Sequence, residues 1–187
     1  MQPAPHPADA VIRPATARDA AGIARVHVES WVDAYAGLLP DTHLLRLDAQ
    51  SHALAWTRRL TRTEERAATL VAVADGDIVG FAHFGRGREP GQMGAGGEVY
   101  MLYVATDWRE RGIGRGLLVA AFTALTRLGE TQASVWCLAE NHSAIGFYQR
   151  LGGQRLPKSR LERVGERDFP VIGFRWNLPV DGLNPPG

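Results

Sequence analysis

The chain has 187 residues, of which 45% are hydrophobic and 22% are charged, and these proportions are typical of one globular domain with a single core. Its 21 basic and 20 acidic residues leave a formal net charge of +1, so we expect neither nucleic acid nor a membrane as a partner. The single cysteine, Cys137, excludes an internal disulfide and fits a reducing, cytoplasmic compartment.

The first half of the chain predicts a strand, two helices and a hairpin. Residues 11–13 are a short strand candidate, and Thr16 with Asp19 forms a capping-box-like start for the first helix. A second, more polar helix is expected over about Leu44 to Leu60. Residues 69–84 predict a β-hairpin, because the turn residues at its centre separate two β-rich runs.

The second half predicts a glycine-rich loop and then alternating strands and helices. A strand from Glu98 to Val104 leads into a glycine-punctuated turn, inside which an amphipathic helix begins. The remaining expected elements are a strand over 133–138, a helix over about 143–151, and two late strands near Gln154 and over 170–176. We found no internal repeat and no linker, so we expect one domain over residues 10–178, a flexible lead-in over 1–9 and a tail over 179–187.

The turn between the fourth strand and its helix carries the strongest chemical signal. It has the sequence Arg109-Glu110-Arg111-Gly112-Ile113-Gly114-Arg115-Gly116. Glycines let backbone amides approach an anion, the helix N-terminus adds partial positive charge, and arginines neutralise phosphate. The turn therefore predicts a pyrophosphate site, although a glycine-rich turn that only packs a helix on a sheet has the same pattern. It lacks the Lys-Ser/Thr pair of a P-loop and the spacing of a dinucleotide-binding fold.

With these residues and their flanks, the chain resembles the GNAT-superfamily N-acetyltransferases. Arg109, Gly112 and Gly114 match the coenzyme-A signature of that family, residues 98–104 resemble its fourth strand, and residues 141–152 resemble its Asn-x-x-Ala-x-x-Phe-Tyr-x-x-x-Gly segment. The resemblance implies an α/β (α+β) fold with a mixed, mostly antiparallel sheet of six to seven strands and helices on both faces. Two positions depart from the family pattern: Thr106 replaces a common proline, and Gly153 replaces a common aromatic residue.

The resemblance implies a reaction and a co-substrate. The expected reaction transfers an acetyl group from acetyl-CoA to a primary amine of a small molecule or a protein, and the alternative is a non-catalytic acyl-CoA-binding or sensing module. Backbone groups of Leu102, Tyr103 and Val104 would pair with the pantetheine arm. Asn141 would bind the same arm, or would only cap a helix. The pyrophosphate would lie against the turn, at Arg109, Glu110, Arg111, Gly112, Ile113, Gly114 and Arg115.

Glu98 and Tyr148 are the expected catalytic residues. An alkylamine with a pKa of about 10.4 is protonated at neutral pH, so a base must accept its proton. We expect Glu98 to do this directly or through water, with a solvated strand-end glutamate as the alternative. Tyr148 matches the general-acid position of the family and would donate to the leaving thiolate, and it equally suits a core position on an amphipathic helix.

The acceptor is expected beside the first helix. The resemblance makes Trp31 and Tyr35 candidate wall residues, and both also suit the core face of that helix. His83 is a third candidate, with a purely structural histidine as the alternative. The six histidines show no metal-ligand spacing, so we expect no metal, and we expect Cys137 to be an inert thiol. The late strands also allow a homodimer.

Overall fold

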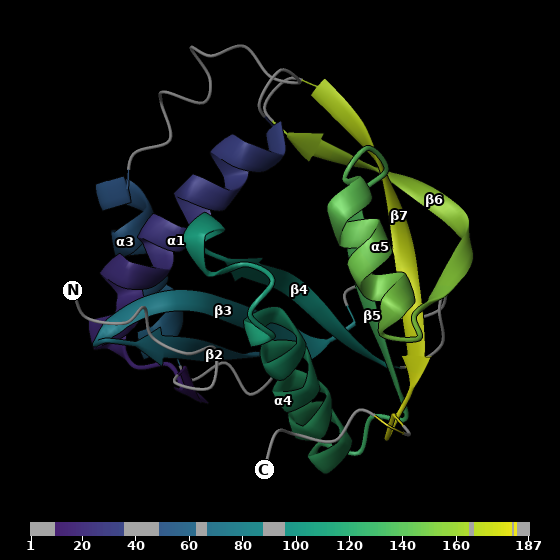
Figure 1. Ribbon diagram of the computed structural model, residues 1–187, viewed down its shortest axis with the longest axis horizontal. Helices are drawn as coiled ribbons and strands as arrows, with labels where there is room; N and C mark the ends of the chain where they lie inside the picture. The colour runs from purple at the N-terminus through teal and green to yellow at the C-terminus, as the bar shows by residue number, and fades with distance from the viewer. Residues whose placement is uncertain are drawn as a thin grey trace.

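A single sheet organises the protein. The computed structural model describes residues 10–35, 49–62, 67–87, 96–164, 167–180 and 182. Within them the strands form one seven-stranded sheet in the order β1-β2-β3-β4-β5-β7-β6 (Figure 1). Every neighbouring pair is antiparallel except β4 with β5. The strands are β1 (Val11–Pro14), β2 (Ala67–Ala74), β3 (Asp77–Arg86), β4 (Gly97–Val104), β5 (Gln132–Leu138), β6 (Gln154–Val164) and β7 (Arg167–Asn177).

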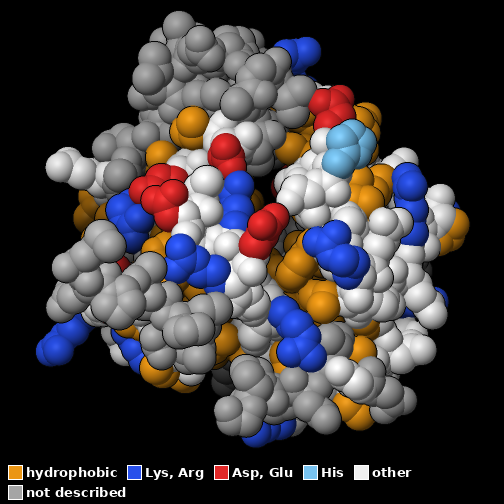
Figure 2. All heavy atoms as spheres, in the orientation of Figure 1, with side chains coloured by type: hydrophobic (Ala, Val, Ile, Leu, Met, Phe, Trp, Pro, Cys, Tyr) orange, Lys and Arg blue, Asp and Glu red, His pale blue; other side chains and the backbone are white. Residues whose placement is uncertain are grey.

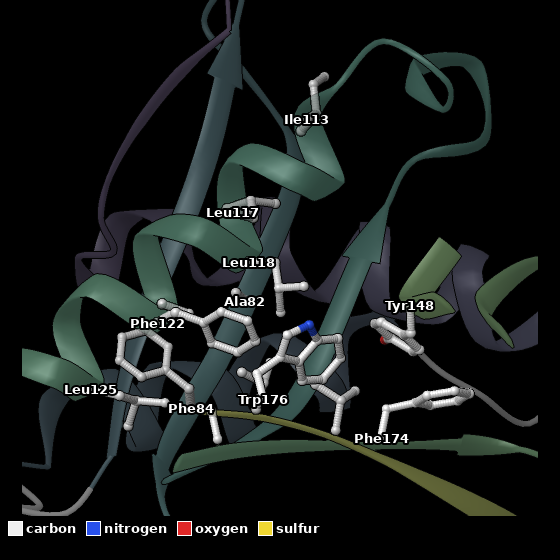
Figure 3. Close-up of a cluster of buried hydrophobic side chains, with 14 of the residues drawn as sticks. Ala82, Phe84, Ile113, Leu117, Leu118, Phe122, Leu125, Tyr148, Phe174 and Trp176 are labelled. Atoms are coloured by element: carbon white, nitrogen blue, oxygen red, sulfur yellow. The ribbon is translucent and has the colours of Figure 1, made fainter. Parts of the chain in front are cut away.

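Helices cover both faces of the sheet, as expected. Helices α1 (Ala20–Tyr35) and α3 (Ala49–Thr61) share a buried apolar cluster with Val71 and Phe81 on one face. Helices α4 (Ile113–Arg127) and α5 (His142–Arg150) pack on the opposite face, in a larger cluster that includes Phe84, Phe174 and Trp176 (Figure 3). The mixed, mostly antiparallel architecture is therefore confirmed.

The start of α1 follows from its local sequence. The backbone N–H and the hydroxyl of Thr16 both donate to Asp19 Oδ2, at 2.7 and 3.0 Å, and a short 3-10 turn (Ala17–Asp19) leads into the helix. Arg13 of β1 donates to both carboxylate oxygens of Asp19, at 2.8 and 2.7 Å. This pairing and the bonds from Thr16 hold the pKa of Asp19 well below its usual value. The capping-box prediction is confirmed.

The remaining expected elements are present with shifted bounds. The second helix is described over Ala49–Thr61, and the first part of its expected range, residues 44–48, lies outside the described residues. The two late strands are longer than expected. β6 and β7 each have 11 residues and pair with one another as an antiparallel hairpin. The expected lead-in over 1–9 lies outside the described residues, as does the expected tail except for residues 179, 180 and 182. None of the described helices is long and apolar enough to cross a membrane.

Candidate active site

The sheet opens between β4 and β5. Their parallel pairing covers only Gly97 to Val99 on β4 and Ala133 to Val135 on β5, whereas β4 runs on to Val104 and β5 to Leu138. On its other edge β4 stays paired with β3 as far as Val104. Residues 100–104 therefore present one backbone edge that has no strand partner in the described part of the chain. This stretch contains Leu102, Tyr103 and Val104, and an extended ligand can pair with such an edge.

The turn that leads into α4 lies at the far end of this open edge. A 3-10 turn (Thr106–Trp108) is followed by two residues with positive φ, Glu110 at 61° and Gly112 at 79°, and Gly112 is the N-cap of α4. Among the described residues, none of the backbone N–H groups from 110 to 115 has a hydrogen-bond acceptor. A Cβ on Gly112 would meet nothing within 4 Å. The turn therefore offers open space in front of several unpaired donors, which suits an anionic group.

The three arginines of the turn have different surroundings. Arg109 forms an ion pair with Asp33 of α1, and its Nε donates to the Val104 carbonyl at 3.3 Å. Arg111 lies over the Trp108 ring, 4.8 Å from its centroid, and Arg115 lies in the first turn of α4. Lys and Arg side chains are frequent on this face of the molecule, over α4 and α5 (Figure 2). Arg109 thus ties the turn to α1, and phosphate contacts by these side chains stay predictions.

Tyr148 projects from α5 into the larger core. Its ring contacts Phe147, Phe174 and Trp176, with centroid distances from 5.3 to 6.0 Å. Figure 3 shows it beside Phe174 and Trp176. Burial raises the pKa of Tyr148 above its usual value, so the hydroxyl keeps its proton. The phenol also interacts electrostatically with Cys137 of β5 and Tyr103 of β4, the two strands that part. Tyr148 is therefore both a core residue and a protonated donor near the opening of the sheet.

Asn141 and Cys137 have structural roles that can be read from their contacts. Asn141 is the N-cap of α5, and its Oδ1 accepts from the Ala144 N–H at 2.9 Å. Its binding to a cofactor arm stays a prediction. Burial raises the pKa of the Cys137 thiol to about 11, which favours the interpretation of Cys137 as an inert thiol. Within the described residues no group of His, Cys, Asp and Glu side chains could hold a metal ion.

Glu98 lies one residue before the point where β4 and β5 part. It is 2% exposed, and its carboxylate faces Arg160 of β6, with Glu98 Oε1 3.8 Å from Arg160 Nη2. The two side chains line a small pocket of about 20 Å³ together with Trp136, Ser134 and Gly97. Such a pocket holds about one water molecule. Glu98 is therefore a buried, ion-paired carboxylate and not a solvated strand-end glutamate.

Glu98 and Tyr148 lie on opposite faces of the sheet. Val99 belongs to the core cluster under α4 that also contains Tyr148. Because successive side chains of a strand alternate between faces, the neighbouring Glu98 projects toward the face that α1 covers. The Glu98 carboxylate and the Tyr148 phenol therefore lie on opposite sides of the sheet, near the place where β4 and β5 part.

The α1 face near the opening is lined by aromatic side chains. Trp31 Nε1 donates to the Tyr103 hydroxyl at 3.2 Å, and the His27 ring stacks on Tyr103 with centroids 5.4 Å apart. His83 is buried in β3, where its Nδ1 lies 2.9 Å from Thr69 Oγ1. Trp31 therefore lies beside the fourth strand, and its contact with an acceptor stays a prediction, as does that of His83. Tyr35 is the last described residue of α1, and its side chain lies outside the described residues.

The structure adds residues that sequence reasoning did not find. Arg160 on β6 lies near β4, because it pairs with Glu98, and Glu162 lies beside it, with its Oε2 3.8 Å from Arg160 Nη2. Trp136 of β5 carries the Arg160 guanidinium over its ring at 4.3 Å. Arg160 and Glu162 are two residues apart, so their side chains lie on the same face of the strand. This spacing is the only feature of the local sequence that could have indicated them. Their position opposite β4 depends on the strand order.

Comparisons with known proteins bear on the family and the fold of this chain. The family model described as the acetyltransferase (GNAT) family matches residues 28–153. The uncharacterized N-acetyltransferase YuaI of Bacillus subtilis is 31% identical over 166 residues, which is 88% of this chain and 91% of that protein. PaiA N-acetyltransferase of Thermoplasma acidophilum, solved in complex with coenzyme A, is 19% identical with a TM-score of 0.67, over 90% of this chain and 99% of that one. YncA of Salmonella typhimurium, solved with its cofactor acetyl-CoA, is 20% identical with a TM-score of 0.67, over 91% of this chain and 94% of that one.

Proposed function

This chain belongs to the GNAT acetyltransferase family, and from that membership we propose that it transfers the acetyl group of acetyl-CoA to a primary amine of a small molecule or a protein. One observation carries the proposal. The unpaired edge of β4 ends at a turn whose backbone donors, from 110 to 115, have no acceptor among the described residues. An extended arm that ends in a pyrophosphate matches this combination, because the arm can pair with the strand while the phosphates meet the helix N-terminus.

We assign the reaction to the two faces of the opening. Glu98 accepts the proton of the attacking amine, either directly or through a water in its small pocket. The new C–N bond forms as the C–S bond breaks, and the Tyr148 hydroxyl donates to the departing sulfur. Burial keeps that hydroxyl protonated, which supports a donor role. A leaving thiol with a pKa near 8.5 gains from such a donor without requiring it.

The first test is thermal unfolding with and without excess acetyl-CoA. A ligand at about 100 times its dissociation constant adds roughly 2.7 kcal/mol to the stability of the folded state, so the melting temperature should rise by several degrees. ATP and NAD at the same concentration should cause no comparable rise. Thiol release in the presence of amines then separates an enzyme from an acyl-CoA sensor, which would bind acetyl-CoA without turnover.

A matched pair of substitutions shows whether the turn binds the ligand. Gly112→Asp places a carboxylate where the phosphates would lie, and it should abolish the stabilisation by acetyl-CoA. Gly129→Asp is the control, because Gly129 has a similar φ of 85°, also meets nothing within 4 Å at Cβ, and lies just beyond the other end of α4. The control should keep the full stabilisation. An unchanged response of the Gly112 variant would remove the turn from the proposal.

A further inference from the structure

The α1 face beside the opening holds an excess of hydrogen-bond donors. His27 and Ser30 lie one helical turn apart on α1 and are 7% and 4% exposed. The His27 Nε2 and Ser30 Oγ atoms are buried and have no hydrogen-bond partner among the described residues, and the same is true of Trp136 Nε1 on β5. Buried polar atoms are almost always paired, so three unpaired atoms on one face point to a missing partner.

The tautomer of His27 follows from its neighbour. The Trp56 indole N–H can only donate, and it lies 3.4 Å from His27 Nδ1. Nδ1 is therefore the acceptor, and the proton of the neutral ring is on Nε2. Desolvation, together with the nearby His52 and Arg59 charges, lowers the pKa of His27 to about 4, so the ring is neutral at physiological pH. The unpaired Nε2 is a donor.

Tyr103 adds a donor by the same reasoning. The Tyr103 hydroxyl oxygen accepts from Trp31 Nε1 at 3.2 Å, so the hydroxyl proton points away from Trp31. That proton has no acceptor among the described residues. Burial raises the pKa of Tyr103 to about 12, which keeps that proton in place. Trp136 Nε1 can only donate. His27, Tyr103 and Trp136 therefore supply three donors without an acceptor, and Ser30 can supply a fourth.

One of these donors lies beside the proposed base, and contacts of Trp31 link it to His27 and Tyr103. Trp136 lines the same pocket as Glu98. Trp31 joins the other groups, because its ring lies 5.8 Å from that of His27, its N–H reaches Tyr103, and it packs in the same small apolar cluster as Trp136. The aromatic side chains on this face therefore carry polar atoms that donate, and one of them, Trp136, lines the pocket of Glu98.

Building on the proposed function, we propose that His27, Ser30, Tyr103 and Trp136 bind an oxygen of the acceptor. The acceptor is then a small amine that carries a carboxylate or carbonyl group beside an apolar side chain, as in an amino acid or its amide. Such an oxygen accepts the hydrogen bonds that the four side chains leave unmade, and the apolar part packs on the aromatic rings. A polyamine offers ammonium donors and no such oxygen, so it matches this face poorly.

The test compares acceptors that differ only in the oxygen-bearing group. L-phenylalanine, L-phenylalaninamide and phenethylamine share the side chain, and spermidine serves as the polyamine. For every acceptor, the kcat/KM of thiol release from acetyl-CoA is calculated from the concentration of unprotonated amine, because the acceptors differ in basicity. We expect one or both oxygen-bearing acceptors to exceed phenethylamine by at least about tenfold, which corresponds to one good hydrogen bond. The acid and the amide separate a carboxylate from a carbonyl. Equal values, or a preference for spermidine, overturn the proposal.

A second measurement keeps this proposal separate from the proposed function. The same four amines are tested for stabilisation of the protein in thermal unfolding with coenzyme A present, which needs no turnover. Preferential stabilisation by the oxygen-bearing amines without thiol release would count against catalysis and in favour of this site. Thiol release with phenethylamine and with none of the other amines would support catalysis and count against this site. Absence of any preference in both measurements overturns the site.

Substitutions identify the residues. Ser30→Ala removes one hydroxyl with little change in shape, and Trp136→Phe removes the indole N–H together with part of the ring. Each should lower the preference for the oxygen-bearing acceptor by about tenfold. His27→Phe should do the same where it folds. Val32→Ala is the control, because Val32 lies on the exposed side of α1 at 40% exposure. Its preference should equal that of the parent protein, and unchanged preferences in both Ser30→Ala and Trp136→Phe would contradict the assignment.

Discussion

At the scale of single residues, the role of the Tyr148 hydroxyl as a donor can be tested separately from the packing of its ring. The ring packs among Phe147, Phe174 and Trp176, whereas the hydroxyl has no hydrogen-bond partner among the described residues. Tyr148→Phe keeps the ring contacts and removes only the donor. We expect kcat to fall by about 100-fold, which is the low end for loss of a general acid, with little change in melting temperature or in stabilisation by acetyl-CoA. Steady-state thiol release checks this, and a variant as fast as the parent would exclude Tyr148 as the acid.

Single residues also show how far sequence reasoning reaches toward the site. The turn from Arg109 to Gly116 is contiguous, so its glycines and helix start are visible without a structure. Glu98 was predicted as a base because of its place on the fourth strand, but its ion pair with Arg160 depends on β6 lying two strands away from β5. Pairings between residues 62 positions apart leave no periodicity in the sequence. A site residue such as Glu98 can therefore be predicted from its own segment, whereas its partners from distant segments cannot.

At the scale of elements, α5 and β7 meet at Gly153. A Cβ on Gly153 would lie 2.5 Å from the Trp176 ring and 2.8 Å from the Tyr148 carbonyl oxygen, and Trp176 is itself fixed by its N–H bond to the Leu151 carbonyl at 2.8 Å. This contact explains why a position that is often aromatic in the family is a glycine here. The sequence showed the departure but not its cause, since Trp176 is distant along the chain and is brought beside Gly153 only by the β6–β7 hairpin.

This contact gives a prediction for the packing of α5. Gly153→Ala should destabilise the protein by about 1–3 kcal/mol, because neither a backbone carbonyl nor a fixed indole can move aside cheaply. Gly146→Ala, inside α5, is the control, since its Cβ would meet only the far end of the Arg150 side chain at 3.2 Å. An alanine inside a helix should stabilise it by about 0.5–1 kcal/mol. Urea unfolding of both variants measures the two effects, and similar stabilities would contradict the contact.

The helix α4 shows where periodicity is reliable and where it fails. The spacing predicts a buried face through Ile113, Leu117 and Ala121, and all three are buried. The same spacing extends to Leu128, which is 63% exposed because the helix ends at Arg127 and Leu128 is its C-cap. Element type and buried face therefore follow from the sequence, whereas the last turn of a helix depends on where the chain leaves the sheet.

At the scale of the whole molecule, Asp19 and His27 are two buried groups with lowered pKa values, and they act on stability in the same direction. Asp19 has a folded-state pKa below its usual value, so its contribution to stability is complete above about pH 4 and is lost as the pH falls further. His27 has a folded-state pKa of about 4 against 6.5 in the unfolded chain. The unfolded state therefore binds more protons between these values, and stability is lost as the pH falls from about 6.5 toward 4. Both groups make the protein sensitive to acid, and His27 acts first.

The His27 effect is large enough to measure. A difference of this size in pKa lowers the free energy of unfolding by about 2 kcal/mol between pH 7.5 and pH 5. His27→Gln cannot take up a proton, so its stability should fall much less over the same range, even if it is lower at pH 7.5. His142→Gln is the control, because His142 is exposed at the start of α5, and it should keep the slope of the parent. Urea unfolding of the three proteins at both pH values checks this. A His27→Gln variant as acid-sensitive as the parent would mean that the buried ring is not held neutral, and the tautomer on which its donor role depends would no longer follow.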